Sequence, residues 1–215
     1  MESTVRAIEK DKIIVIVRGV ARDKLIPLAE SMYNGGIRLI ECTYDAKGII
    51  SNEEMASRIA MLADHFGNDM LVGAGTVLST EQVELTKNAG GKCIISPDTN
   101  PEVIAKTKEL GLVSIPGALT PTEIAAAYAA GADFVKLFPI DVIGGAKYVK
   151  SVKAPLSHIR MLAVGGVTEN NLREFIDSGA CGIGVGSGII DKNLIEKGDF
   201  EAITKLAERY TSQIQ

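Results

Sequence analysis

The chain alternates short apolar runs with longer segments in which apolar residues recur every three or four positions. Eight runs of four to six residues have the length and composition of strands that are buried on both faces. They lie at residues 13–17, 37–42, 70–73, 92–96, 112–115, 133–137, 160–164 and 182–185. Helical spacing fills segments between them, for example residues 22–33, 52–65, 80–87 and 121–129. The pattern therefore predicts alternating strands and helices.

Glycine and proline mark the boundaries of these elements. Pro121 stands near the start of one predicted helix, directly after Thr120, which is a favourable N-cap residue. Glycine tolerates the left-handed backbone that ends a helix, so a glycine before an apolar run indicates a helix end followed by a strand. Such glycines are Gly35, Gly36, Gly90, Gly91, Gly111, Gly131 and Gly179.

Strict alternation of strand and helix requires a parallel sheet, either doubly wound or closed into a barrel. A dinucleotide-binding sheet would carry a G-x-G-x-x-G motif after its first strand, whereas this chain reads Arg18-Gly19-Val20-Ala21 there. Residues capable of chemistry follow nearly every strand, which favours a barrel over a sheet with a single switch point. We therefore predict a fold of the α/β class, a single-domain (β/α)₈ TIM barrel over residues 1–215 with an N-terminal helical extension.

Charge and composition narrow the range of partners. The formal net charge of −4 disfavours nonspecific binding to nucleic acid or to anionic membranes. No apolar run reaches the roughly 18 residues of a membrane span, and the first residues lack the apolar core of a signal peptide. We expect a cytoplasmic protein that binds a small molecule, with no nucleic acid and no membrane partner.

The cysteines and histidines do not suggest a metal site. Cys42, Cys93 and Cys181 each lie in an apolar run, which argues against a disulfide framework and leaves no zinc-binding spacing. His65 and His158 fall away from the predicted strand ends. We therefore expect no metal.

Two charged residues stand near the C-terminal ends of predicted buried strands. Lys136 shares one strand face with Phe134 and Phe138, and Glu41 shares one with Thr43. Burial disfavours the ammonium form of lysine and can supply a free amine nucleophile, while a buried carboxyl can shuttle protons. The alternative is structural: Lys136 in a buried ion pair or reaching out of the sheet, and Glu41 balancing a cation.

The loops after the last two strands and the first strand carry candidate binding residues. Gly165-Gly166 and Gly186-Ser187 stand where barrels commonly bind phosphate through backbone N–H groups. Ordinary turn chemistry is the alternative for both pairs. Arg18 follows the first strand, where it could bind a substrate carboxylate bidentately or simply face solvent.

With these residues placed, nearly the whole chain, from about Ile13 to Tyr210, resembles the KDPG/KHG aldolases, which are class I aldolases of 2-keto-3-deoxy-6-phospho sugar acids. The resemblance rests on seven pieces in the expected order, at residues 35–41, 72–78, 95–97, 115–117, 135–139, 165–167 and 186–187. It implies a (β/α)₈ barrel, no metal or organic cofactor, and a homotrimer.

The resemblance also implies roles for individual residues. Lys136 is similar to the Schiff-base lysine and Glu41 to the acid–base residue of the family. The implied substrate-binding residues are Thr76 and Pro97 in the pyruvyl pocket, Phe138 as its wall, and Gly165, Gly166, Gly186 and Ser187 around the phosphate.

Two departures from the family pattern bear on the substrate. KDPG enzymes follow the glutamate with Val-Thr-Leu-Arg, and that arginine binds the carboxylate, but here Asp45 stands in its place. They also carry Pro-Thr-Gly-Gly where this chain reads Ala163-Val164-Gly165-Gly166. The second run resembles the phosphogalactonate branch, in which an arginine after the first strand assists substrate binding. Arg18 fits that role.

Several functions remain open on the sequence. Within the aldolases, the substrate is a phosphogluconate-type or phosphogalactonate-type acid, or unphosphorylated 4-hydroxy-2-oxoglutarate. A phosphate-binding isomerase or synthase with Glu41 as base and Lys136 as its electrostatic partner is a second class. A catalytically silent barrel that binds a sugar phosphate is a third.

Overall fold

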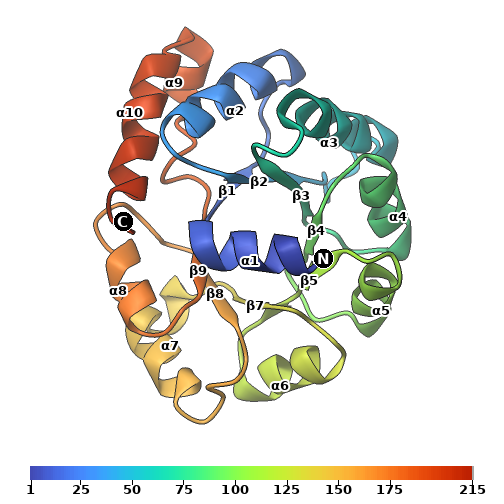
Figure 1. The fold of residues 1–215 in the computed structure, drawn as a ribbon, viewed down its shortest axis with the longest axis vertical. Helices are drawn as coiled ribbons and strands as arrows, with labels where there is room; N and C mark the ends of the chain where they lie inside the picture. Colours follow the sequence, from blue (N-terminus) through green and yellow to red (C-terminus); the bar gives the residue numbers. More distant parts are fainter. Residues whose placement is uncertain (215) are drawn as a thin grey trace.

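The computed structural model describes residues 1–214, and Gln215, the last residue of the predicted domain, lies outside the described residues. Parallel strands form a barrel with helices around it (Figure 1), so the predicted (β/α)₈ fold is confirmed. The strands are β1 (Ile13–Val17), β2 (Leu39–Thr43), β3 (Leu71–Gly75), β4 (Cys93–Ile95), β5 (Val113–Ile115), β6 (Gly117–Ala118), β7 (Val135–Leu137), β8 (Met161–Val164) and β9 (Gly182–Val185).

The strand order is β5-β4-β3-β2-β1-β9-β8-β7-β6. β5 and β6 together fill one strand position of the barrel, which we call the β5/β6 stave. They are separated at Pro116, which has no N–H to donate to a neighbour. The Pro116 carbonyl still accepts the N–H of Lys136 at 2.8 Å, and the Ser114 carbonyl accepts that of Phe134 at 3.2 Å. The stave therefore pairs with β4 on one side and β7 on the other, which brings the two ends of the sheet together.

The helices cover the outside of the barrel in chain order (Figure 1). They are α1 (Glu2–Asp11), α2 (Leu25–Asn34), α3 (Asn52–Phe66), α4 (Thr80–Asn88), α5 (Pro101–Glu109), α6 (Pro121–Ala129), α7 (Gly145–Lys153), α8 (Leu172–Asp177), α9 (Lys192–Lys197) and α10 (Phe200–Thr211), with short 3₁₀ turns η1 (Arg22–Lys24) and η2 (Asp141–Ile143). The predicted helix at 121–129 is confirmed, and Thr120 caps it in a capping box with Glu123.

Strand boundaries differ from prediction where side chains compete with the ladder. β2 begins at Leu39; the Arg38 side chain donates to the carbonyls of Tyr33 and Ile37 in the preceding turn, while the Arg38 carbonyl accepts the N–H of Leu71. β7 begins at Val135 because the Asp133 carboxylate accepts the Ser114 N–H and binds Lys108, which holds residue 133 in a loop.

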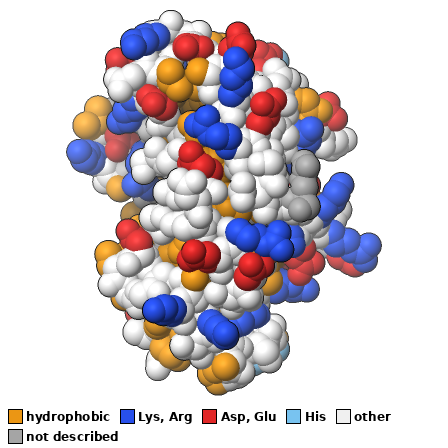
Figure 2. All heavy atoms as spheres, turned by 90° about the vertical axis from the view of Figure 1, so that its left-hand side faces the viewer, with side chains coloured by type: hydrophobic (Ala, Val, Ile, Leu, Met, Phe, Trp, Pro, Cys, Tyr) orange, Lys and Arg blue, Asp and Glu red, His pale blue; other side chains and the backbone are white. Residues whose placement is uncertain are grey.

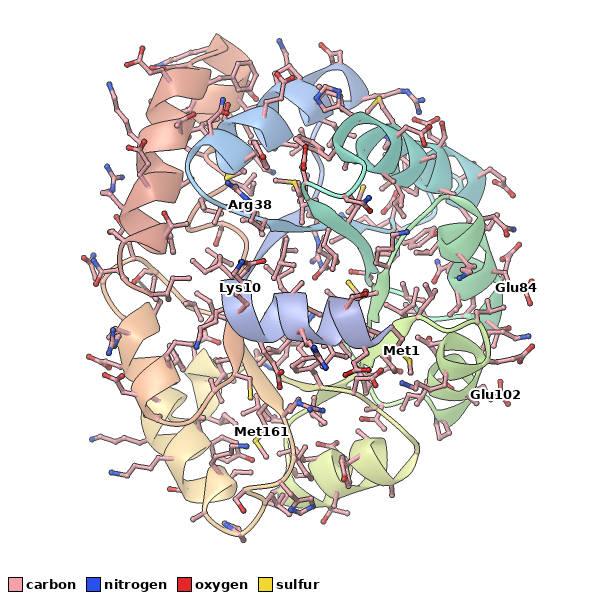
Figure 3. All side chains as sticks on the ribbon, viewed as in Figure 1. Met1, Lys10, Arg38, Glu84, Glu102 and Met161 are labelled. Atoms are coloured by element: carbon pink, nitrogen blue, oxygen red, sulfur yellow. The ribbon has the colours of Figure 1, made fainter. Side chains whose placement is uncertain are left out.

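Helix α1 lies across the N-terminal end of the barrel, and Met1 and Lys10 mark its two ends (Figure 3). Ile8 of α1 is fully buried and packs with side chains that point into the barrel, including Ile14, Phe134 and Leu162. The predicted N-terminal helical extension is confirmed. It closes this end with apolar side chains, so access to the barrel interior is from the C-terminal ends of the strands.

The face formed by α8 and α10 carries Lys, Arg, Asp and Glu side chains interspersed with one another (Figure 2). Within residues 1–214, no helix has both the length and the apolar character that crossing a membrane requires.

Candidate active site

Strand alternation directs Glu41 on β2 and Lys136 on β7 toward the inside of the barrel. Their side chains are almost completely buried, with exposed fractions of 1% and 5%. Both line one small internal cavity, whose other walls are apolar residues such as Ile115 and Leu162. The cavity measures about 10 Å³, roughly the space that one water molecule needs. The sequence therefore brings one amine and one carboxyl to opposite sides of a dry chamber.

The apolar surroundings shift the pKa of each group in the direction that favours its uncharged form. Burial raises the pKa of the Glu41 carboxyl, and the charges of Lys136 and Arg18 only partly offset this. Burial likewise lowers the pKa of the Lys136 amine; Glu41 opposes that shift, and Arg18 adds to it. Among the ion pairs of residues 1–214, Glu41 and Lys136 are not joined within 4.0 Å. An amine with a lowered pKa is a nucleophile, and a carboxyl with a raised pKa can give and take protons.

Gly75 makes the space that the Glu41 side chain occupies. A Cβ atom on Gly75 would overlap the Oε1 atom of Glu41. Oε1 is buried and has no hydrogen-bond partner among the described residues, so it is free to accept a proton. We did not assign Gly75 a role from the sequence. The signal was present, since Gly75 pairs in register with Thr43, on the same face of β2 as Glu41.

Arg18 and Thr76 meet at the rim of the barrel. The guanidinium of Arg18 donates to the Oγ1 atom of Thr76 at 3.0 Å. Thr76 has a φ of 55°, which is costly for a β-branched residue and is typical of backbone held in place at a functional site. Both residues line a pocket of about 380 Å³ between the loops that follow β1 and β2. Lys47, Arg58 and Asp45 also line this pocket, so three cations with Arg18 face one carboxylate, and the balance favours an anion.

Asp45 is occupied by its own loop. Its carboxylate accepts the backbone N–H groups of Lys47, Ile49 and Ile50 at 2.9–3.0 Å. These bonds also hold the pKa of Asp45 below its usual value. The preceding residue, Tyr44, is buried and binds outside the barrel, to Gln82 and Thr86 of α4. Asp45, which stands where the family pattern has an arginine, thus stabilises its own loop.

Phe138 and Pro97 also lie at the C-terminal ends of strands. The ring of Phe138 lies 4.6 Å from the Lys136 amine and covers it. The Pro97 backbone approaches Gly117 so closely that a side chain on this glycine would overlap it. Gly117 pairs in register with Lys136. Both residues therefore stand near the amine.

The glycine pairs after β8 and β9 differ in their surroundings. Gly165 and Gly166 have φ values of 112° and 63°, which favour glycine, and both contact the side chain of Asp141. A Cβ atom on Gly165 would lie 2.9 Å from the Oδ1 atom of Asp141. Gly186 has room around it, since a Cβ there would come no closer than 3.8 Å to Ile16, and Ser187 is exposed. Sequence reasoning did not anticipate the Asp141 carboxylate beside this loop.

Across residues 1–214, no three His, Cys, Asp or Glu side chains come together in an arrangement suited to a metal ion. Among the residues described above, the chemistry available at the strand ends is that of the Lys136 amine, the Glu41 and Asp141 carboxyls, the Arg18 guanidinium, and the hydroxyl and backbone groups around them.

Comparison of the chain with known proteins points to one family. A 2-dehydro-3-deoxy-phosphogluconate aldolase of Treponema pallidum is 33% identical over 206 residues, which cover 94% of this chain and 93% of that protein. A 2-dehydro-3-deoxy-6-phosphogalactonate aldolase of Escherichia coli is 35% identical over 178 residues, covering 82% and 83%.

Solved structures agree in fold. A native KDPGal structure superposes with a TM-score of 0.82 at 31% identity, covering 94% of this chain and 93% of the other. A Legionella pneumophila KDPG aldolase superposes with a TM-score of 0.85 at 24% identity, covering 95% and 96%. The family model of KDPG and KHG aldolase matches residues 5–206. Together with the relatives above, this match shows that the chain belongs to the KDPG and KHG aldolase family, whose members are carbon–carbon lyases.

Proposed function

We propose that this protein is a class I aldolase that reversibly cleaves a 2-keto-3-deoxy-6-phospho sugar acid to pyruvate and glyceraldehyde 3-phosphate. Lys136 is the Schiff-base nucleophile and Glu41 is its proton shuttle. The observation that carries the proposal is the pair itself: a desolvated amine and a desolvated carboxyl facing one small cavity inside an apolar barrel.

The reaction begins when the lone pair of the Lys136 amine attacks the C2 ketone. Glu41 supplies the proton that leaves with water as the carbinolamine becomes a protonated imine. Glu41 then accepts the C4 hydroxyl proton while the C3–C4 bond breaks and its electron pair moves toward the imine nitrogen. The aldehyde departs, the enamine is protonated at C3, and water hydrolyses the pyruvyl imine. A cavity with room for one water between the two groups supports proton transfer through that water.

Reductive trapping tests the nucleophile. We expect pyruvate with borohydride to label Lys136 and no other lysine, because this amine has its pKa lowered by burial and lies at the centre of the barrel. Peptide mapping by mass spectrometry gives the labelled position. Borohydride without pyruvate is the control. A label on another lysine, or none, would refute the imine mechanism and favour the isomerase or silent-barrel alternatives.

The substrate class is carried over from the relatives, which are named for phosphogluconate and phosphogalactonate derivatives. Gly165, Gly166, Gly186 and Ser187 then form a phosphate cradle, a name we use for these four residues. Open backbone geometry supports this assignment, since two of the glycines have positive φ and a third has free space above it.

Replacing Gly186 by Ala tests the phosphate cradle without disturbing the fold. Gly186 does not need positive φ, and its nearest neighbour to a new Cβ is 3.8 Å away, so the variant should fold normally. We expect a KM about tenfold higher for the phosphorylated substrate, since a methyl group blocks close approach of the phosphate. Cleavage of 4-hydroxy-2-oxoglutarate should change less than twofold. Equal losses on both substrates would contradict a phosphate-specific role.

Asp141 supports a second candidate substrate. Its carboxylate contacts Gly165 and Gly166, where it would repel a phosphate dianion more than a single carboxylate. This favours 4-hydroxy-2-oxoglutarate, cleaved to pyruvate and glyoxylate by the same imine chemistry. The ratio of kcat/KM for the two substrates decides between them.

Arg18 and Thr76 are the proposed site for the substrate carboxylate, together with Pro97 and Phe138 as pocket walls. Because a bidentate guanidinium contact is strong and directional, we expect Arg18→Lys to raise the KM for pyruvate in the synthesis direction. Arg18→Ala should raise it further, by about 10- to 100-fold. Lys47→Ala, which removes a cation of the same pocket that has no bond to Thr76, is the matched control. A loss with Lys47→Ala alone would move the carboxylate contact to Lys47.

The remaining proposals rest on the sequence and the family resemblance. The protein acts in the cytoplasm as a homotrimer on small-molecule substrates. It uses no metal and no organic cofactor, since lysine, glutamate and water supply every proton and electron pair that the mechanism needs.

A further inference from the structure

Tyr210 on α10 is a fully buried tyrosine whose hydroxyl group has no hydrogen-bond partner among the described residues. A buried hydroxyl left unpaired costs free energy, so its position needs an explanation. Burial, together with the nearby Glu169 carboxylate, raises the pKa of Tyr210 to about 12. The hydroxyl is therefore neutral, and the group that it faces is Glu169 of the loop after β8.

The Tyr210 hydroxyl lies behind both loops of the phosphate cradle. On one side it contacts Gly188, where a Cβ atom would overlap its Oη atom. The same Cβ position on Gly188 is 3.1 Å from the carbonyl oxygen of Val167, which belongs to the other loop. Gly188 does not have positive φ, so the close approach of Tyr210 is the reason that this position admits no side chain.

Each of the two loops is a hydrogen-bonded turn. A displacement of Gly188 or Val167, on the side of Tyr210, is therefore passed on to the cradle residues of the same loop. In the loop after β8, the Asn171 side chain accepts the N–H of Thr168 and donates to the carbonyl of Gly166. In the loop after β9, the Gly186 carbonyl accepts the N–H groups of Ile189 and Ile190 at 3.0 and 2.9 Å. Gly188 and Val167 thus lie within hydrogen-bonded turns that begin at Gly186 and Gly166.

Helix α10 is itself anchored, which makes it a suitable support. It lies alongside α2 (Figure 1), and the Thr211 hydroxyl donates to the carbonyl of Gly35 at 2.8 Å. Next to Tyr210, Arg209 pairs with Glu169 of the loop after β8 at 3.6 Å. Two consecutive residues of α10 thus reach the loops of the cradle.

We infer that Tyr210 is a positioning residue that sets the spacing of the two phosphate-cradle loops and so controls affinity for the phosphate group of the substrate. The inference rests on the proposed phosphate cradle. Tyr210 does not touch the reacting atoms, and its effect is confined to the phosphorylated end of the substrate.

The first test replaces Tyr210 by Phe, which removes only the hydroxyl oxygen. We expect the KM for the phosphorylated substrate to rise about three- to tenfold, because the loops shift into the space that the oxygen leaves, with kcat unchanged. Exchange of the pyruvate C3 protons, which involves no phosphate, should stay within twofold of wild type. Because removing an unpaired buried hydroxyl removes the cost of burying it, Tm should not fall.

Thr107→Val is the matched control, since Thr107 is also buried but its hydroxyl is hydrogen-bonded to the Val103 carbonyl within α5. This variant should lower Tm by about 2–4 °C and leave the KM for the phosphorylated substrate unchanged. The two variants together separate a general stability effect from an effect on phosphate binding.

Gly188→Ala supplies the decisive comparison. Its methyl group would meet the Tyr210 hydroxyl and spread the loops, so the KM for the phosphorylated substrate should rise more than in Tyr210→Phe. In the double variant the oxygen is gone and the methyl group has space, so the KM should fall back toward that of Tyr210→Phe alone.

An unchanged KM in Tyr210→Phe, or strictly additive effects in the double variant, would overturn the inference. If Gly186→Ala still impairs only the phosphorylated substrate, the proposed cradle stands while the role of Tyr210 falls. If wild-type protein itself does not prefer a phosphorylated substrate, the proposed cradle fails first, independently of Tyr210.

Discussion

Lys136→Met should abolish aldol cleavage while leaving the barrel folded. Methionine has a similar length and no amine, so no imine can form, and loss of a covalent nucleophile typically lowers kcat on the order of 10⁴- to 10⁶-fold. The assay is cleavage of the phosphorylated substrate, with a circular dichroism spectrum to check the fold. Lys150→Met, on the exposed side of α7, is the control and should retain full activity. Residual activity within 100-fold of wild type would rule out Lys136 as the nucleophile.

The same variant should gain thermal stability in a pH-dependent way. In the folded protein burial lowers the pKa of Lys136, so the unfolded chain binds a proton that the folded chain releases. The cost of keeping this amine neutral falls as pH rises toward the ordinary lysine value of 10.5. The Tm advantage of Lys136→Met should therefore be largest at low pH and shrink between the lowered pKa and 10.5. A Tm below wild type at every pH would indicate instead that Lys136 forms a stabilising ion pair.

Glu41→Gln should lower kcat by roughly 10²- to 10⁴-fold, the usual loss for a general acid–base group. Glutamine fits the space opposite Gly75 and cannot carry a proton between the amine, the water and the substrate. Borohydride trapping of pyruvate should become slower but still label Lys136. Glu109→Gln, an exposed carboxylate on α5, is the control. A loss below tenfold would make Glu41 a counter-ion only.

Gly75→Ala is the natural companion to that experiment. The new methyl group would displace the Glu41 carboxyl without changing its chemistry. An effect on kcat similar to that of Glu41→Gln would tie the rate to the position of Oε1 as well as to its proton.

The fold could be predicted because its main determinants are local and periodic. Apolar runs of strand length and glycines at helix ends occur in strict alternation, and few architectures accommodate that order. Boundaries differ by one or two residues at strand ends, where the Arg38 and Asp133 side chains bind neighbouring backbone groups.

The candidate site was predicted in part, for a related reason. Lys136 and Glu41 stand out because charge on a buried strand is rare and costly. Asp141 and Tyr210 gave no such signal, since one is an ordinary turn residue and the other an ordinary helical core residue in the sequence. Their importance arises from contacts across 24 and 22 positions of the chain, to Gly165 and Gly188, which no local pattern encodes.

Helix α1 should influence the proton affinity of Lys136 from the opposite end of the barrel. Ile8 packs against Ile14, Ile115 and Leu162, three side chains that also wall the cavity below Lys136. Without this helix, water would reach that cavity from the opposite end of the barrel and solvate the ammonium form. The first turns of the chain thus exclude water from the apolar interior below Lys136. A fusion or truncation that loosens them would shift the pH dependence of the rate, while every residue at the strand ends stayed in place.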